Sequence, residues 1–566
     1  MEMVRKHGAM LVIALSIFVS DTHASTQWVM GYYVGYQASS FPPSAINWTD
    51  LTHIIMAPMT ANADGSLDTS FDIDKVNGPI LAQTISANAH GAGRQALLML
   101  GGAGNGKNIL SSVTNHEATF VANLLAAMSN LGYDGIDLDW EDHVDWAKFD
   151  TLVHDLRNAA PNAILTLPGP ALNLNTDTVD PHIPDIVKML DRFNIQSYDG
   201  STVYSGSGWD SWYDSALMGE TPSTPVDINS SLGAYVAAGI PKAKLGMGIG
   251  FAAICYTNGI TQAYQPTAPD TLFDDDNWFT YGQLYGTNGT FAQRYRHWDA
   301  SADEPYLSLP QPEAHGCQFI SMEDEASVAK KGAYSRKNGF GGIIVWTLGE
   351  GYVPSHPARN FMLDAVANAF LYPNATATAA VSVMQGDTWL KPSASHHFDA
   401  LVTGTTNKAV SWSIAESDCG TIDGKGNYAA PTSQKTCHLT ATSSADPSRT
   451  ATVQITITKK GWSPQMTVTR YSEGVFTVTT TDSTVASVSV DLPASITCNW
   501  GYDFTGTQNA TVCPVPPTGT NSFSTYIVFP DSGGAYPFEI RSTNNRLTKQ
   551  TLTVPSCNPD SNGVCQ

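Results

Sequence analysis

Short apolar runs alternate with amphipathic segments from about residue 28 to about residue 370. Eight runs have the length and composition of buried strands, and they span residues 28–33, 51–58, 95–100, 133–140, 163–167, 193–198, 244–250 and 341–346. Between the third and fourth runs, apolar side chains recur at helical spacing. This alternation predicts a (β/α)8 TIM barrel. An open doubly wound sheet is the alternative, but no glycine-rich turn of the nucleotide-binding kind follows the first run.

The interval between the seventh and eighth runs, residues 251–340, is too long for one loop and one helix. It contains two cysteines and two tryptophans, Cys255, Cys317, Trp278 and Trp298. We therefore expect a small disulfide-tied insertion after strand 7, on the upper face of the barrel.

The pattern changes near residues 372–376, where helical periodicity stops. Period-2 alternation replaces it at residues 409–414, 438–442 and 452–458, with Asp-Gly and Asn turns between the runs. The barrel is thus followed by two all-β sandwich-like modules. The predicted boundaries are residues 1–24 for a leader, 25–372 for the barrel domain, 377–460 for the first module and 461–566 for the second.

The first residues resemble a cleaved leader more than a membrane anchor. Arg5 and Lys6 precede an apolar run at residues 9–19, and small residues lead to a cleavage site after about Ala24. A run of this length is too short to cross about 30 Å of hydrocarbon. The sequence predicts a signal peptide and secretion to the extracellular space.

Eight cysteines fit an exported chain. Eight cysteines allow about 105 pairings, and neighbours within a domain favour the pairs Cys255–Cys317, Cys419–Cys437, Cys498–Cys513 and Cys557–Cys565. No CxxC spacing of a zinc or redox site occurs.

The charge of the chain limits the classes of partner that we expect. The net charge is −22, from 29 basic and 51 acidic residues. A negative surface repels nucleic acid and anionic membranes, so neither is expected as a partner. We expect a monomer.

The fourth run carries the candidate chemistry. Alternate side chains of a strand face one way, so Asp137, Asp139 and Glu141 project together into the barrel. Carboxylates this close cannot all ionise, and the pKa of at least one must rise. A carboxylic acid that stays protonated suits glycosidic bond cleavage. A divalent cation site and a solvated edge strand are the alternatives.

The motif DGIDLDWE at residues 134–141 resembles the DxxDxDxE signature of glycoside hydrolase family 18, the chitinases and their relatives. Residues 31–33 resemble the family's first-strand GYY, residues 196–199 its MxYD, and residues 341–346 its last strand. The resemblance covers about residues 28–370 and places the insertion where chitinases have one.

The resemblance implies a substrate-assisted, retaining mechanism. Glu141 would be the general acid and then the base. Asp139 would orient the acetamido group of the substrate, Asp137 would share a proton with Asp139, and Tyr198 would donate a hydrogen bond to the acetamido oxygen. No cofactor and no metal are implied.

Further contacts to the sugar are implied for four residues, Asp199, Tyr32, Trp346 and Gln196. Aromatic residues in upper-face loops are candidates either for sugar stacking or for packing, namely Trp209, Trp212, Tyr213 and Trp278.

Two departures from the family pattern concern this site. Met99 stands where a serine usually hydrogen-bonds the inner aspartate, which leaves the neutralisation of Asp137 without its usual partner. Gln196 replaces a methionine two residues before Tyr198 and makes that wall more polar.

The leading hypothesis is a secreted chitinase that hydrolyses β-1,4-linked N-acetylglucosamine polymers. An endo-β-N-acetylglucosaminidase acting on glycoprotein N-glycans and a sugar-binding lectin or adhesin are the alternatives. The first module resembles bacterial immunoglobulin-like repeats at residues 420–428. In the second, aromatics between Cys498 and Cys513 are candidates for carbohydrate binding, namely Trp500, Tyr502 and Phe504.

Overall fold

The computed structural model describes most of the chain from Gln27 onward. The described residues are 27–200, 208–268, 271–273, 279–312, 316–459, 464–470, 475–482, 485–491, 512–515, 517–519, 522–526, 529–530, 532–542, 547–558 and 565. The predicted leader, Trp278, Cys498 and the three aromatics of the second module lie outside these residues.

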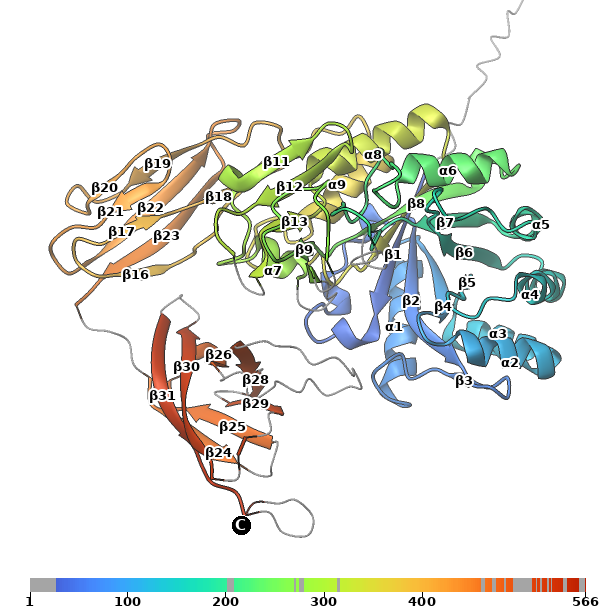
Figure 1. Cartoon of the computed structure of the whole chain (residues 1–566), viewed down its shortest axis with the longest axis horizontal. Helices are drawn as coiled ribbons and strands as arrows, with labels where there is room; N and C mark the ends of the chain where they lie inside the picture. The colour runs from blue at the N-terminus through green and yellow to red at the C-terminus, as the bar shows by residue number, and fades with distance from the viewer. Residues whose placement is uncertain are drawn as a thin grey trace, which may run out of the picture.

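Parallel strands close into a barrel in the N-terminal part (Figure 1). Neighbouring strands follow the order β1-β14-β8-β7-β6-β5-β4-β2, and pairing of β1 with β2 closes the ring. The strands are β1 (Trp28–Val34), β2 (His53–Ala61), β4 (Gln95–Gly101), β5 (Gly135–Asp139), β6 (Ile164–Pro170), β7 (Arg192–Gln196), β8 (Leu245–Gly250) and β14 (Gly342–Trp346). Each apolar run of the sequence forms one of them, so the predicted barrel is confirmed. The short β3 (Leu67–Asp68) extends β2 as a hairpin.

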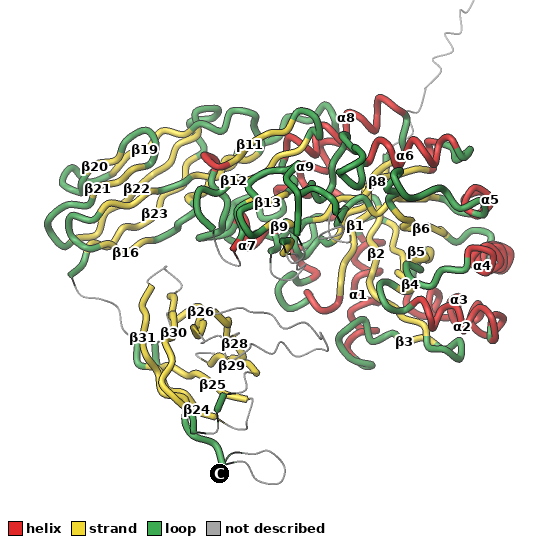
Figure 2. The backbone as a smooth tube through the Cα atoms, viewed as in Figure 1, coloured by secondary structure: helices red, strands yellow, loops and turns green. Residues whose placement is uncertain are grey.

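Helices cover the outside of the barrel (Figure 2). They are α1 (Asn77–Gly91), α2 (Gly106–Asn115), α3 (Glu117–Leu131), α4 (Trp146–Ala159), α5 (Ile183–Met189), α6 (Ile228–Ala237), α8 (Glu325–Asn338) and α9 (Phe361–Phe370). Their apolar faces and the outward side chains of the strands share one large core. Burial of that apolar surface is the main stabilising contribution. A separate cluster, which includes Tyr32, Met99 and Tyr198, fills the barrel interior.

The predicted insertion folds as a five-stranded antiparallel sheet of order β10-β9-β13-β12-β11. Its strands are β9 (Ile254–Tyr256), β10 (Leu272–Phe273), β11 (Arg296–Asp299), β12 (Glu304–Ser308) and β13 (Phe319–Ser321), with the short α7 (Tyr281–Tyr285) between β10 and β11. The predicted disulfide Cys255–Cys317 joins β9 to the segment that leads into β13. This insertion thus has its own sheet and its own covalent tie.

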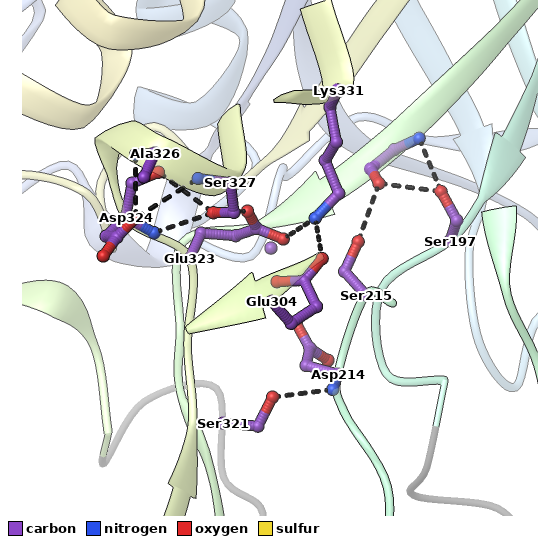
Figure 3. Close-up of polar contacts among 12 residues, drawn as sticks. Ser197, Asp214, Ser215, Glu304, Ser321, Glu323, Asp324, Ala326, Ser327 and Lys331 are labelled. Atoms are coloured by element: carbon purple, nitrogen blue, oxygen red, sulfur yellow. Dashed lines mark hydrogen bonds and ion pairs between the residues drawn. The ribbon is translucent and has the colours of Figure 1, made fainter. Parts of the chain in front are cut away.

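A buried ionic cluster fastens the insertion to the barrel (Figure 3). Lys331 of α8 binds Glu304 of β12 at 2.5 Å and also binds Glu323, which follows β13. All three side chains are at most 2% exposed. Because a buried charge without a partner is costly, the three groups must stay together, and they hold β12 and β13 against α8.

Two all-β modules follow the barrel, as the period-2 alternation predicts. The first contains β15 (Ala380–Val383), β16 (Thr388–Leu390), β17 (Ser395–His397), β18 (Ala400–Thr403), β19 (Val410–Ile414), β20 (Thr421–Ile422), β21 (Asn427–Ala429), β22 (Lys435–Ser443) and β23 (Thr450–Ile457). Its disulfide Cys419–Cys437 is present as predicted. Ion pairs join it to the insertion and to α8, between Arg294 and Asp399 and between Lys408 and Glu325.

The second module forms two four-stranded sheets, β24-β25-β29-β28 and β27-β26-β30-β31. The strands are β24 (Met466–Arg470), β25 (Val475–Thr480), β26 (Val485–Asp491), β27 (Val512–Val515), β28 (Pro517–Gly519), β29 (Ser522–Tyr526), β30 (Gly534–Ser542) and β31 (Leu547–Val554). The disulfide Cys557–Cys565 is present as predicted. Through the described part of the chain, no helix has both the length and the apolar character to cross a membrane.

A carboxyl pair outside the site makes the stability depend on pH. Asp50, at the end of the 3-10 helix η3 (Trp48–Asp50), is buried, and its pKa rises to about 8 because of burial and of its hydrogen bond to Asp364 in α9. A carboxyl group with a raised pKa contributes stability at low pH, and this contribution is lost as the pH rises through the folded-state value.

We expect Asp50→Asn to remove this dependence, since the amide is neutral at every pH. From about pH 7 to about pH 9 the native protein should lose about 1 kcal/mol that the variant keeps. Chemical denaturation at several pH values measures both. Equal losses in the two proteins would contradict the expectation.

Candidate active site

The acidic row of the sequence forms the centre of the site. Asp137 and Asp139 of β5 are buried inside the barrel, and Glu141, two residues beyond the end of β5, is exposed at its mouth. The intervening Ile136 and Leu138 belong to the outer core shared with the helices. The predicted alternation along this strand is therefore confirmed.

Two hydroxyl groups hold the innermost carboxylate. Tyr32 donates to Asp137 Oδ2 at 2.7 Å, and Thr166 donates to Asp137 Oδ1. Burial raises the pKa of Asp137 to about 6, and these two hydrogen bonds oppose the rise because they stabilise the charged form.

Thr166 replaces the hydrogen-bond donor to Asp137 that is missing because Met99 stands in place of a serine. Met99 of β4 has no hydroxyl group. The hydroxyl comes instead from β6, where Thr166 pairs with Asp137 in the parallel register. Sequence reasoning missed Thr166, because the register between two strands cannot be read from either strand alone. An inward polar residue in an otherwise apolar run was the available signal.

The middle carboxyl group of the row is buried and hydrogen-bonded to Glu141. Asp139 is 2% exposed and hydrogen-bonds to Glu141. Burial first, and then the charges of Glu141 and Asp137, raise its pKa well above the usual value. The row therefore retains a proton at a pH where isolated carboxyl groups have lost theirs.

Two glycines at the end of β4 let this strand approach the backbone of Asp139 closely. Gly101 and Gly102 have φ values of 104° and 91°, which favour glycine. A side chain on Gly101 would overlap the Asp139 carbonyl oxygen, and Gly102 N–H donates to that oxygen at 2.8 Å. The pair thereby fixes the backbone of Asp139.

Gln196 faces the outer carboxyl groups. Its Nε2 donates to Glu141 Oε1 at 2.7 Å and lies 3.5 Å from Asp139 Oδ1. The amide that replaces the family methionine thus orients the exposed carboxyl group of Glu141.

Three aromatic rings pack together beside the carboxyl groups. Tyr198 and Trp346 stack with centroids 6.4 Å apart and an interplanar angle of 13°, and Tyr32 meets Trp346 edge-on at 5.2 Å. Burial raises the pKa of Tyr198, as do the charges of Asp139 and Glu141, so its hydroxyl stays protonated as a donor. Gly248 of β8 leaves room for the Tyr198 ring.

The barrel matches the sequence pattern of a known protein family. The model of the glycosyl hydrolases family 18 matches residues 28–351, which is more than half of the chain. The chain belongs to family 18 of the glycosyl hydrolases. The predicted family membership is thus confirmed.

Individual relatives are distant. The chain is 25% identical over 394 residues to a chitinase-like effector of Moniliophthora perniciosa, covering 59% of this chain and 85% of that protein. It is 26% identical over 349 residues to Chitinase 1 of Aphanocladium album, covering 55% and 78%. The structure of chitinase ChiA74 from Bacillus thuringiensis is similar, with a TM-score of 0.50 at 18% identity, covering 93% of this chain and 100% of that one. This last likeness concerns the fold.

Not all loop aromatics of this family 18 barrel are available for stacking. Trp212 and Tyr213 are at most 1% exposed. Trp212 Nε1 donates to the Val226 carbonyl at 2.7 Å, and Tyr213 donates to Asp299 at 3.0 Å. Both are packing anchors, the second of the two roles that the sequence allowed.

Asp199 follows Tyr198 at the mouth of the family 18 barrel, beyond the end of β7. Its backbone N–H donates to Asp214 Oδ1 at 2.6 Å. Within the described residues, no group of three or more His, Cys, Asp or Glu side chains has the arrangement of a metal site.

Proposed function

We propose that the protein is a secreted chitinase that hydrolyses β-1,4-linked N-acetylglucosamine polymers by a substrate-assisted, retaining mechanism. The observation that carries the proposal is the row of carboxyl groups Asp137, Asp139 and Glu141, which leads from the buried barrel interior to the solvent and in which the pKa of Asp139 is raised. Membership in family 18 and the chitinases among its relatives support the same substrate.

Glu141 acts as the general acid. It transfers its proton to the glycosidic oxygen as the bond from that oxygen to C1 breaks. The acetamido carbonyl oxygen of the same sugar attacks C1 and forms an oxazolinium ion. The Glu141 carboxylate then removes a proton from water, whose oxygen attacks C1 as the bond from C1 to the acetamido oxygen breaks, and two inversions at C1 give retention.

Asp139 stabilises the cationic intermediate. Its carboxylate accepts a hydrogen bond from the acetamido N–H and balances the positive charge, while the Tyr198 hydroxyl donates to the acetamido oxygen. The raised pKa of Asp139 means that its carboxyl group keeps a proton in the resting site. Moving that proton to Asp137 leaves Asp139 charged when charge develops on the substrate.

The remaining residues shape the sugar site. Trp346 supplies a flat face under the reacting sugar, a surface to which pyranose rings stack well. Tyr32 supports Asp137 from below, Asp199 contacts the sugar beside Tyr198, and Gln196 binds it beside Glu141.

We expect Thr166→Val to lower kcat about tenfold, because the Thr166 hydroxyl is one of two that fix the orientation of Asp137, and a displaced Asp137 is misaligned for the proton that it receives from Asp139. Without the hydroxyl, the pKa of Asp137 rises above about 6, since a contact that favours the charged form is gone. The acid side of the pH–rate profile should therefore move to higher pH. Thr166→Ser keeps the hydroxyl and should restore both values; a valine variant with the native profile would contradict the role.

One experiment tests the substrate. The protein is incubated with chitin oligomers and, separately, with a high-mannose glycoprotein, and the products are sized. Shortened N-acetylglucosamine oligomers support a chitinase, whereas release of N-glycans alone would establish an endo-β-N-acetylglucosaminidase. Binding without cleavage of either would identify a lectin.

Export fits the described disulfides, which persist in oxidising compartments. We propose that the leader is cleaved after about Ala24 and that the mature chain acts as an extracellular monomer without a cofactor. The predicted boundaries at residues 377–460 and 461–566 belong to the same proposal, with the first module as an immunoglobulin-like spacer and the second as a binding module.

Deleting residues 462–566 should lower turnover of insoluble chitin several-fold and leave hydrolysis of soluble oligomers unchanged. A tethered second site raises the effective concentration of the barrel at the polymer surface without altering its chemistry. Rates on both substrates, measured for the full chain and the shortened one, check this. Equal rates on insoluble chitin would make the second module a spacer.

A further inference from the structure

Asp199 has a backbone conformation that needs support. Its φ is 56°, in the left-handed region, where a residue other than glycine is strained by about 1–3 kcal/mol. Two hydrogen bonds hold the segment there. Asp199 N–H donates to Asp214 Oδ1 at 2.6 Å, and Gly200 N–H donates to the Asp214 carbonyl at 2.9 Å.

Asp214 also lies beside Tyr198. It is 4% exposed, and a Cβ atom on Gly250 would be 3.5 Å from Asp214 Oδ2 and 3.4 Å from Tyr198 Cβ. The carboxylate of Asp214 and the base of the Tyr198 side chain therefore flank the same face of Gly250, at the end of β8. Asp214 thus contacts the segment 198–200 through its side chain and its backbone carbonyl.

The insertion determines where Asp214 lies. Asp214 N–H donates to Ser321 Oγ at 2.8 Å, and Ser321 is the last residue of β13 and 2% exposed. Two residues later, Glu323 binds Lys331 of α8 in the buried ionic cluster (Figure 3). The strand that supports Asp214 is thus clamped to a barrel helix.

We propose that Asp214 is a positioning residue for the reaction, which holds Tyr198 and Asp199 in place and which β13 of the insertion holds in turn. The proposal rests on the proposed function. Contacts of Tyr198 with the acetamido group strengthen as the oxygen attacks C1, so a displaced Tyr198 weakens the transition state more than the bound substrate. The insertion thereby becomes part of the framework that positions the catalytic groups.

Kinetics on a soluble chitin oligomer test the proposal. Asp214→Ala should lower kcat about 10²-fold with KM within about threefold, because small displacements of reacting groups have effects of that size. Asp214→Asn keeps an Oδ1 acceptor for Asp199 N–H and should return kcat to within about fivefold of native. Ser321→Ala, which removes the acceptor for Asp214 N–H, should fall between the two.

Ser211→Ala is the matched control in the same loop. Ser211 is fully buried, donates to the Gln262 carbonyl at 2.8 Å and accepts from Gln265 N–H at 3.0 Å. Its loss should lower thermal stability without the fall in kcat. Equal kcat losses in Ser211→Ala and Asp214→Ala would overturn the proposal, as would native kcat in Ser321→Ala if Asp214→Ala does not fold.

Hydrogen exchange separates this proposal from the proposed function. The Asp199 and Gly200 amides should exchange faster in Asp214→Ala, or in Ser321→Ala if the alanine variant at Asp214 does not fold, than in Ser211→Ala. Unchanged exchange overturns the positioning role even if the native protein cleaves chitin. A native protein that cleaves no chitin oligomer overturns the proposed function, whatever the exchange shows.

Discussion

Glu141→Gln is expected to lower kcat on unactivated chitin oligomers by about 10²–10⁴-fold, the contribution of a positioned general acid. The amide has the shape of the carboxyl group but carries no proton for the glycosidic oxygen. Because Gln196 and the buried carboxyl groups remain, oligomer binding should persist. Steady-state kinetics and calorimetric titration measure the two effects.

The neighbouring Asp142 offers a matched control. Asp142 Oδ1 accepts from Gly106 N–H at 2.8 Å, and an asparagine retains that acceptor. Asp142→Asn should keep kcat near the native value. Activity of Glu141→Gln within about threefold of native would remove Glu141 from the role of general acid.

Asp139→Asn should lower kcat by the equivalent of about 3–4 kcal/mol, the range measured for preorganised groups that stabilise developing charge. The asparagine orients an amide but carries no negative charge, so the oxazolinium ion loses its counter-ion. The rate on a soluble oligomer is the measurement. Asp134→Asn is a control on the same segment, since the Asp134 side chain binds His90 at 2.9 Å and Ala96 N–H at 2.8 Å, both of them structural partners.

A thiazoline analogue of the oxazolinium ion tests the same step in the native protein. It should inhibit strongly, and the products should keep the anomeric configuration of the substrate. Indifference to the analogue, or inverted products, would exclude the substrate-assisted route.

The strands of the barrel could be predicted because their apolar runs are long and their spacing is regular. The carboxylates of β5 could be placed on one face for the same reason, since the period of a strand is two residues. Both predictions depend on local pattern, and both are confirmed.

Contacts between different elements could not be predicted from local sequence patterns. Thr166 meets Asp137 through the register of β5 and β6, and Asp199 N–H meets Asp214, which lies 15 residues further along the chain. The burial of Trp212 and Tyr213 depends on the insertion packed over them, which no local pattern reveals. The fold could therefore be predicted from periodicity, but the contacts that position the site residues could not.

The ion pairs that join the first module to the rest affect how the chain responds to proteases. Residues 372–378, between α9 and β15, are exposed, and backbone there is accessible to cleavage. A cut would leave Arg294 paired with Asp399, Lys408 paired with Glu325, and Gly404 N–H bound to Glu325 at 2.6 Å. The two fragments would thus elute together as a nicked complex and separate only when salt or denaturant weakens these bonds.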